Sequence, residues 1–240
     1  MYHVQLKVNN MTYADLDPLA VQKRKIPPAR RSVAGIYAFR GESSIPYEST
    51  LERDFLLLQE FNASVLDVIT QPVEIPFSGR NGRRFTYTPD FLVVKRLGAS
   101  HYNCYPKPLL IEVKPEAEWR AHWREWLPKW KAARHFAVQQ GWVFHIYDES
   151  RIRNQTLRNV RFLEPYKRMM FDPEDTRRVL NTLQAMGGAS FQYLLTRHYM
   201  GIYQATGVAH LWHLLASRQI DCDMTLPLTE RTELWTVTND

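Results

Sequence analysis

Short apolar runs separated by polar turns dominate the chain up to about residue 150, and they predict strands. Runs of strand length cover residues 65–69, 71–77, 83–94, 109–113 and 142–147. The turn sequence at 78–82, which contains two glycines, predicts a hairpin between the second and the third of these runs. We therefore expect an α/β domain with buried strands in this part of the chain.

Two segments of the same part show helical spacing instead. Residues 47–61 carry Leu51, Phe55 and Leu58 at positions i, i+4 and i+7. Residues 116–140 are helical in pattern but contain Pro128, which predicts two helices or a kink. Four tryptophans share one face of this segment if the proline permits: Trp119, Trp123, Trp126 and Trp130. Core packing explains them better than an exposed stripe that faces DNA or a partner.

The pattern changes near residue 165, where a mainly helical part begins. Helices are predicted at 174–186, 191–199 and 208–217, and short strand-like pieces follow between residues 220 and 237. Three helices followed by a hairpin outline a winged helix. We therefore divide the chain into a basic arm (1–40), an α/β domain (41–165) and a winged-helix-like domain (166–240).

The helix predicted at 208–217 has the amphipathic pattern of a surface helix. It is expected to carry four residues near its exposed face or its end: His210, Trp212, His213 and Arg218. A winged helix commonly places such a helix on DNA, and the same surface can instead dock a protein. A zinc site at the two histidines lacks further ligands, so we do not expect one.

The charge balance favours a polyanionic partner. The formal net charge is +6 and the pI is about 9.3. Basic residues crowd the N-terminal arm: Lys23, Arg24, Lys25, Arg30 and Arg31. A DNA-contacting arm and a solvated tail explain them equally well. The predicted hairpin carries Arg80, Arg83 and Arg84, for which contact with the DNA backbone and a solvated turn also stay open.

Composition narrows the location of the protein. The two cysteines, Cys104 and Cys222, lie far apart, which argues against structural zinc and a disulfide framework. The first ten residues contain no apolar targeting segment, and no apolar run reaches the roughly 18 residues that span a bilayer. We expect a cytoplasmic protein without a membrane partner.

Two acids at the edges of apolar runs predict a metal site. Asp90 precedes the run 91–94, while Glu112 and Lys114 lie two residues apart on one strand and so point to the same face. If strands 85–94 and 109–114 pair, these three side chains converge. Two carboxylates with a carbonyl of Ile111 or Val113 suit Mg²⁺, and Mn²⁺ is expected to substitute. Such a metal activates water and polarises a phosphodiester, while Lys114 stabilises charge on the phosphoryl oxygens.

The same residues resemble a known family. Pro89-Asp90 with Glu112-Val113-Lys114 resembles the PD-(D/E)XK restriction-endonuclease-like superfamily, and more closely TnsA, the endonuclease subunit of heteromeric transposases. In TnsA a helix that bears a catalytic glutamate precedes the two strands. Here 51–58 followed by 64–68 matches that order, and the resemblance covers about residues 45–150 and, more loosely, the remainder.

The resemblance implies a role for each matched residue. Glu52, Asp90, Glu112 and Lys114 would be catalytic, and the three acids would bind the metal. Glu48 lies four residues before Glu52, so it is an alternative ligand or a supporting acid. Relatives can carry glutamine at the position of Glu112, so the metal ligand set here would be fuller.

The resemblance also implies a function and partners. The chain would be a Mg²⁺-dependent DNA endonuclease that cuts the 5′ (non-transferred) strands at the double-stranded ends of a transposon. A DDE-type transposase subunit would cut and join the 3′ ends, and an AAA+ regulator would be the other partner. An RNA-guided complex that selects the target is compatible with this role. A stand-alone restriction or repair endonuclease and a non-enzymatic DNA-binding scaffold remain the alternatives.

Overall fold

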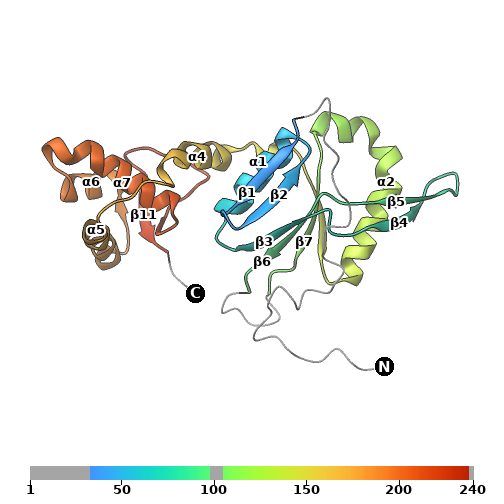
Figure 1. Cartoon of the computed structure of the whole chain (residues 1–240), viewed down its shortest axis with the longest axis horizontal. Coiled ribbons are helices and arrows are strands. Elements are labelled where there is room, and N and C mark those ends of the chain that lie inside the picture. The colour runs from blue at the N-terminus through green and yellow to red at the C-terminus, as the bar shows by residue number, and fades with distance from the viewer. Residues whose placement is uncertain (1–32, 98–104, 238–240) are drawn as a thin grey trace, which may run out of the picture. The chain divides into compact units, whose positions relative to one another are not determined.

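A computed structural model describes residues 33–97 and 105–237, and within them the chain forms two compact units. The first contains residues 33–56 and 64–148, and the second contains residues 57–63 and those from 149 onward. The predicted mixed α/β character is confirmed (Figure 1). The basic arm residues Lys23 to Arg31 lie outside the described residues.

A four-stranded sheet forms the centre of the first unit. Its strands are β3 (Val65–Thr70), β6 (Phe91–Lys95), β7 (Leu109–Val113) and β8 (Val143–Tyr147), adjacent in that order. β6 runs antiparallel to both β3 and β7, and β8 runs parallel to β7. The apolar run of β6 and the residues Leu110 to Val113 of β7 are buried, as the continuous apolar runs predicted.

A hairpin precedes the first helix. Strands β1 (Gly35–Phe39) and β2 (Ser43–Tyr47) pair antiparallel, and α1 (Thr50–Phe61) follows. The prediction of a helix from residue 47 was therefore wrong at its start, and β1 lies within residues 1–40, for which we predicted no strand. The physical reason is that residues 43–47 are occupied by pairing with β1, whereas Ser49 supplies the cap of the helix.

The predicted strand 83–94 is divided in two. Residues 84–87 form β5 (Arg84–Tyr87), which pairs with β4 (Ile75–Ser78) as a separate two-stranded sheet. The chain leaves this hairpin at Thr88-Pro89, where proline offers no N–H for a ladder, and enters the central sheet as β6. The turn predicted between the strands is confirmed, since the N–H of Gly79 donates to the carbonyl of Arg83.

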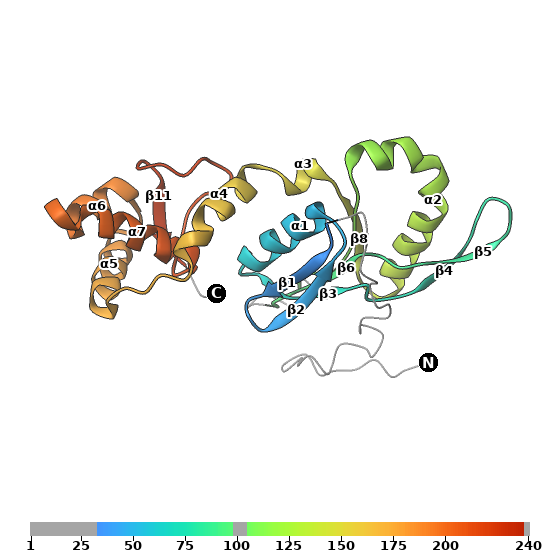
Figure 2. The same cartoon turned by 45° about the horizontal axis from the view of Figure 1, so that its top comes forward.

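The segment with the proline is one helix, α2 (Glu116–Gln139), with Pro128 inside it. Figures 1 and 2 show that α2 bends along its course, so the predicted kink is present while two separate helices are not. The C-terminal part of α2 buries Trp130, Ala133 and Ala137 in one core cluster with Leu92 and Leu110.

The second unit is mainly helical. Its helices are α3 (Glu149–Ile152), α4 (Gln155–Leu163), η3 (Glu164–Tyr166), α5 (Pro173–Met186), α6 (Phe191–His198), η4 (Gly201–Tyr203) and α7 (Gln204–Ala216). Three short strands form an antiparallel sheet in the order β10 (Ile220–Asp221), β11 (Glu233–Thr236), β9 (Ala189–Ser190). Asp172 caps α5, and Gly187 ends it in the left-handed conformation.

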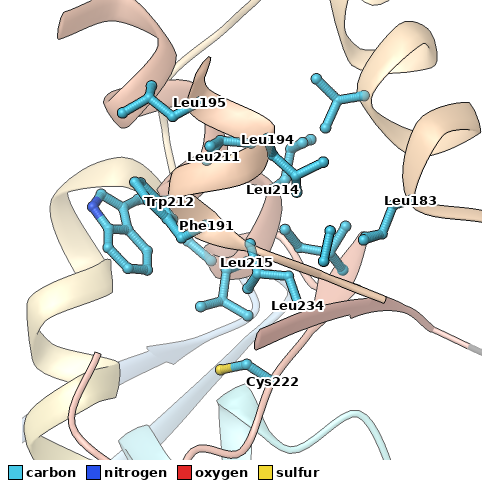
Figure 3. Packing of buried hydrophobic residues seen from close by; sticks show 14 of the residues in the cluster. Leu183, Phe191, Leu194, Leu195, Leu211, Trp212, Leu214, Leu215, Cys222 and Leu234 are labelled. Carbon is cyan, nitrogen blue, oxygen red and sulfur yellow. The ribbon is translucent and has the colours of Figure 1, made fainter. Parts of the chain in front are cut away.

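Helix α7 lies in the core of this unit. Leu211, Leu214 and Leu215 are fully buried, and Trp212 stacks on Phe191 of α6 at a ring distance of 4.1 Å (Figure 3). The expectation that α7 exposes His210 and Trp212 was therefore wrong. The pattern assigned these residues to the surface because their side chains contain polar groups. His210 is nevertheless 1% exposed, and its ring nitrogens form hydrogen bonds with Tyr199 and Thr176 inside the core.

The second unit also takes in the end of α1. Phe61 packs against its core, Glu60 forms an ion pair with Lys167, and Arg218 lies over the Phe61 ring. By contacts the units divide between Asp148 and Glu149, whereas we placed the domain boundary near residue 165. The intervening residues fold as α3 and α4, and Leu157, Val160 and Leu163 of α4 are buried.

Two smaller features complete the fold. No helix in the described part of the chain is both long and apolar enough to cross a membrane. Cys222 is a buried free thiol whose pKa is raised to about 12 by burial, so it is held as the unreactive thiol.

Candidate functional site

Asp90 lies at the start of β6, across from Glu112 of β7. The register that pairs Phe91 with Ile111, continued by one residue, places these two acids opposite each other. The Asp90 Oδ2 accepts a hydrogen bond of 2.7 Å from the backbone N–H of Val113, which fixes the carboxylate at this end of the strands. The convergence that strand pairing predicted is therefore present.

The surroundings of Asp90 contain too little positive charge. Burial raises its pKa well above the ordinary value, and the carboxylates of Glu112 and Glu52 raise it further. Lys114 and the Val113 N–H act in the opposite direction without offsetting this. Glu112 and Glu52 thus repel the buried Asp90 carboxylate, and an additional cation beside Asp90 would offset that repulsion.

Glu112 is buried and held by three side chains. Its side chain is 2% exposed. Tyr87 donates its hydroxyl to Oε2 at 2.5 Å, and Lys129 donates its ammonium to Oε1 at 3.2 Å. Lys114 lies 3.9 Å from the same Oε1. Because Tyr87 comes from β5 and Lys129 from α2, elements outside the central sheet orient this carboxylate.

Lys114 follows β7 directly and is positively charged near neutral pH. Desolvation acts to lower its pKa, but the carboxylates of Asp90 and Glu112 outweigh that effect, so the pKa is raised overall. A lysine in this state cannot serve as a general base. It can stabilise negative charge that develops on a nearby group.

Glu52 lies in the first turn of α1 and caps the helix. Its Oε2 accepts the backbone N–H of Glu48 at 2.8 Å, and its Oε1 accepts the hydroxyl of Ser49 at 2.9 Å. Ser49 in turn accepts the N–H of Glu52, so Ser49 and Glu52 bond to each other at the N-terminus of the helix. Burial raises the pKa of Glu52 despite these hydrogen bonds.

Glu48 is placed differently from our expectation. It precedes α1 and does not share a helix face with Glu52, because the helix begins at Thr50. Its charge nevertheless raises the pKa of Glu52.

The donor set fits a hard divalent cation in part. Asp90 and Glu112 supply carboxylate oxygens at one strand end, which is the ligand type that Mg²⁺ and Mn²⁺ prefer. Glu52 acts on Asp90 electrostatically, yet both of its oxygens bond within the cap. Across residues 33–97 and 105–237, no group of three or more His, Cys, Asp or Glu side chains is gathered closely enough to hold a metal. A metal here would require Glu52 to leave or share its cap.

The other predicted residues lie apart from this centre. Arg80, Arg83 and Arg84 are exposed on the β4–β5 hairpin, which keeps both of their interpretations open. Among the tryptophans of α2, Trp130 is buried and Trp119 and Trp126 pack against the core, as expected. Trp123 is exposed.

Tyr87 and Lys129 are the site residues that sequence reasoning missed. Tyr87 lies three residues before Asp90 in a strand that was predicted, so its nearness was a usable signal. Lys129 comes from another element, seventeen residues after Glu112, and no local pattern indicates their contact. The one hint was its position between Trp126 and Trp130, which were expected to face the core.

Two family models match consecutive parts of the chain. A model described as "TnsA-like endonuclease N terminal" matches residues 62–149, and one described as "TnsA endonuclease C terminal" matches residues 151–224. The border between the two matches coincides with the division between Asp148 and Glu149. A search of curated proteins finds no significant match.

Proposed function

Because the chain belongs to the TnsA family of transposon endonucleases, we propose that it cuts the 5′ (non-transferred) strand at each transposon end by metal-dependent hydrolysis. The observation that supports this reaction is the juxtaposition of Asp90, Glu112 and Lys114 at one end of β6 and β7. Clustered carboxylates suit a divalent cation, and a protonated lysine beside them can stabilise the anionic transition state of phosphodiester cleavage.

The proposed mechanism assigns one task to each side chain. Asp90 and Glu112 would hold a divalent cation, with Glu52 as the third acid and Glu48 as the alternative. When bound, Mg²⁺ activates a water molecule and polarises the scissile phosphate. Lys114 faces the negative charge that builds up on the phosphoryl oxygens, and Tyr87 keeps the Glu112 carboxylate in place through its hydrogen bond.

We further propose that the first unit is a PD-(D/E)XK-type nuclease domain and the second a winged helix. The order α5, β9, α6, α7, β10, β11 with a small antiparallel sheet supports the latter. Since α7 is buried, DNA or a partner would meet the exposed face of α6 instead. That face carries Gln192, Tyr193, Thr196 and Arg197.

The proposed partners follow from the family. They are double-stranded transposon ends, a DDE-type transposase that processes the 3′ ends, and an AAA+ regulator. The second unit would recruit the regulator, DNA, or both.

Cleavage of labelled transposon-end DNA tests this function. The chain is assayed alone and with its transposase and regulator, in Mg²⁺, Mn²⁺ or EDTA. We expect 5′-strand cleavage that needs metal and partners and that Asp90→Ala abolishes. Cleavage by the chain alone would favour a stand-alone nuclease, and metal-independent DNA binding without cleavage would favour a scaffold. Activity of Asp90→Ala near that of the wild type would contradict the assigned site.

A further inference from the structure

Lys129 lies closer to Glu112 than Lys114 does, although Lys114 is the lysine of the sequence motif. The Lys129 ammonium lies 3.2 Å from Glu112 Oε1, compared with 3.9 Å for Lys114. Its side chain is 18% exposed and that of Lys114 is 28% exposed. The buried Glu112 carboxylate therefore already has a nearby counter-ion. This counter-ion comes from α2 and not from β7, the strand that carries Glu112.

Aromatic rings surround the Lys129 ammonium. It lies 4.6 Å from the ring centroid of Trp126, 4.9 Å from that of Tyr87 and 5.9 Å from that of Trp130. Cations within about 6 Å of a ring face are attracted by the quadrupole of the ring. The cage of Tyr87, Trp126 and Trp130 therefore stabilises the ammonium independently of Glu112.

These contacts create a conflict with metal binding. Each oxygen of Glu112 already accepts a hydrogen bond, Oε2 from Tyr87 and Oε1 from Lys129. A divalent cation on Glu112 would come within a few ångströms of the Lys129 charge, and like charges at that distance repel strongly. Either the metal binds weakly, or the ammonium withdraws from Oε1 while the cage keeps it in place.

We propose that Lys129 is a further positioning residue of this site, the resident counter-ion of Glu112 that a divalent metal must displace. It holds the buried carboxylate in place without metal, lowers the affinity for metal, and retreats onto the aromatic cage when metal binds. This inference rests on the proposed metal-dependent function. Loss of a residue that supports a metal ligand usually weakens metal binding. Loss of Lys129 should instead strengthen it.

The test is Mn²⁺ binding to the full chain without DNA, measured by titration calorimetry and by electron paramagnetic resonance of free Mn²⁺. Lys129→Met keeps an apolar stem in the cage, and Lys129→Gln keeps a neutral donor in case the methionine variant does not fold. Both should bind Mn²⁺ about tenfold more tightly than the wild type, because one repelling charge is gone. Lys129→Arg keeps the charge and should bind within about threefold of the wild type. Lys131→Met, which removes an exposed charge of the same helix, should change nothing.

The Mn²⁺ affinities of these variants test both the role of Lys129 and the metal site itself. Unchanged or weaker Mn²⁺ binding by both neutral variants would overturn the inference, and tighter binding by Lys129→Arg would overturn the role of charge. Asp90→Ala serves as the reference for the site itself. If the wild type and Asp90→Ala bind Mn²⁺ equally, or neither binds it, the proposed metal-dependent function fails first. If only Asp90→Ala loses binding and the Lys129 variants equal the wild type, only the present inference fails.

Discussion

Replacing Asp90 by asparagine should stabilise the metal-free protein while it abolishes cleavage. The pKa of Asp90 is raised well above its ordinary value by burial and by Glu112, even after Lys114 and the Val113 N–H are taken into account. The folded protein as a whole therefore prefers a neutral group at this position. Asparagine is neutral, has nearly the same shape, and keeps an oxygen that can accept the Val113 N–H.

The size of the effect follows from two opposing contributions. The hydrogen bond to Val113 weakens from a charge-assisted one, about 1.5–3 kcal/mol, to a neutral one, about 0.5–1.5 kcal/mol. Relief of the buried, repelled charge exceeds this loss, because the net pKa shift is upward. We expect a gain in the range of other single stabilising substitutions, about 0.5–2 kcal/mol. For a chain of this length that is a rise in Tm of roughly 1–8 °C.

Scanning calorimetry in EDTA measures the gain, and its pH dependence tests the cause. The folded pKa of Asp90 is raised, so its destabilising contribution is absent below the unfolded value of 3.8 and grows as the pH rises toward the folded pKa. The advantage of the variant should therefore be small near pH 4 and largest at pH 8. Mg²⁺ should raise the Tm of the wild type and not that of the variant. A variant less stable than the wild type at pH 8, or a gain independent of pH, would refute this reasoning.

Three further outcomes are expected. Glu52→Gln should abolish 5′ cleavage while Glu48→Gln keeps part of it; the reverse result in the end-cleavage assay would assign the ligand to Glu48. Lys114→Ala should lower the cleavage rate by about 10²-fold or more without weakening Mn²⁺ binding, since its charge acts on the reaction; loss of calorimetric Mn²⁺ binding would contradict that role. The second unit should lose stability as the pH falls below about 6.5, because burial lowers the pKa of His210; urea titrations between pH 8 and 5 should show this, and His210→Gln should flatten the dependence.

The sequence predicted best those elements whose signal is local and continuous. The run 109–113 forms β7 over the same residues, because buried strands show uninterrupted apolar patterns. The strand expected at 83–94 failed where a proline interrupts pairing, and that proline was visible. The start of α1 was also readable, since Ser49 and Glu52 have the spacing of a capping box.

The helix α7 shows where pattern reasoning fails. A histidine and a tryptophan count as polar or amphipathic in a helical wheel, so His210 and Trp212 were assigned to a surface. Hydrogen bonds from distant residues, Tyr199 and Thr176, satisfy the His210 ring inside the core. Such partners are set by tertiary packing, and the spacing of residues within one helix contains no information about them.

In the candidate site, too, some contacts could be predicted from the sequence and others depend on tertiary packing. The convergence of Asp90, Glu112 and Lys114 followed from strand pairing and alternation, which are local rules. The contact of Lys129 with Glu112 depends on the path of α2 over the sheet, which no local rule provides. The part of the site that a motif describes was therefore predictable, and the part that sets its electrostatics was not.

Each acid of the site is satisfied by the protein itself, and this determines how a metal can enter. Asp90 accepts a hydrogen bond from the Val113 N–H, and Glu112 accepts hydrogen bonds from Tyr87 and Lys129. Glu52 accepts one from the backbone N–H just before its own helix. The fold therefore does not depend on metal, and metal must exchange with existing hydrogen bonds. Recruiting Glu52 weakens its hydrogen bonds from the Glu48 N–H and the Ser49 hydroxyl, about 1.5–3 kcal/mol each for bonds to a charged group, so additional metal ligands favour recruitment. A DNA phosphate adds such oxygens, and we expect transposon-end DNA to tighten Mn²⁺ binding to the cleavage-impaired Lys114→Ala protein. Equal Mn²⁺ affinity with and without that DNA would show that the three acids alone form the complete metal site.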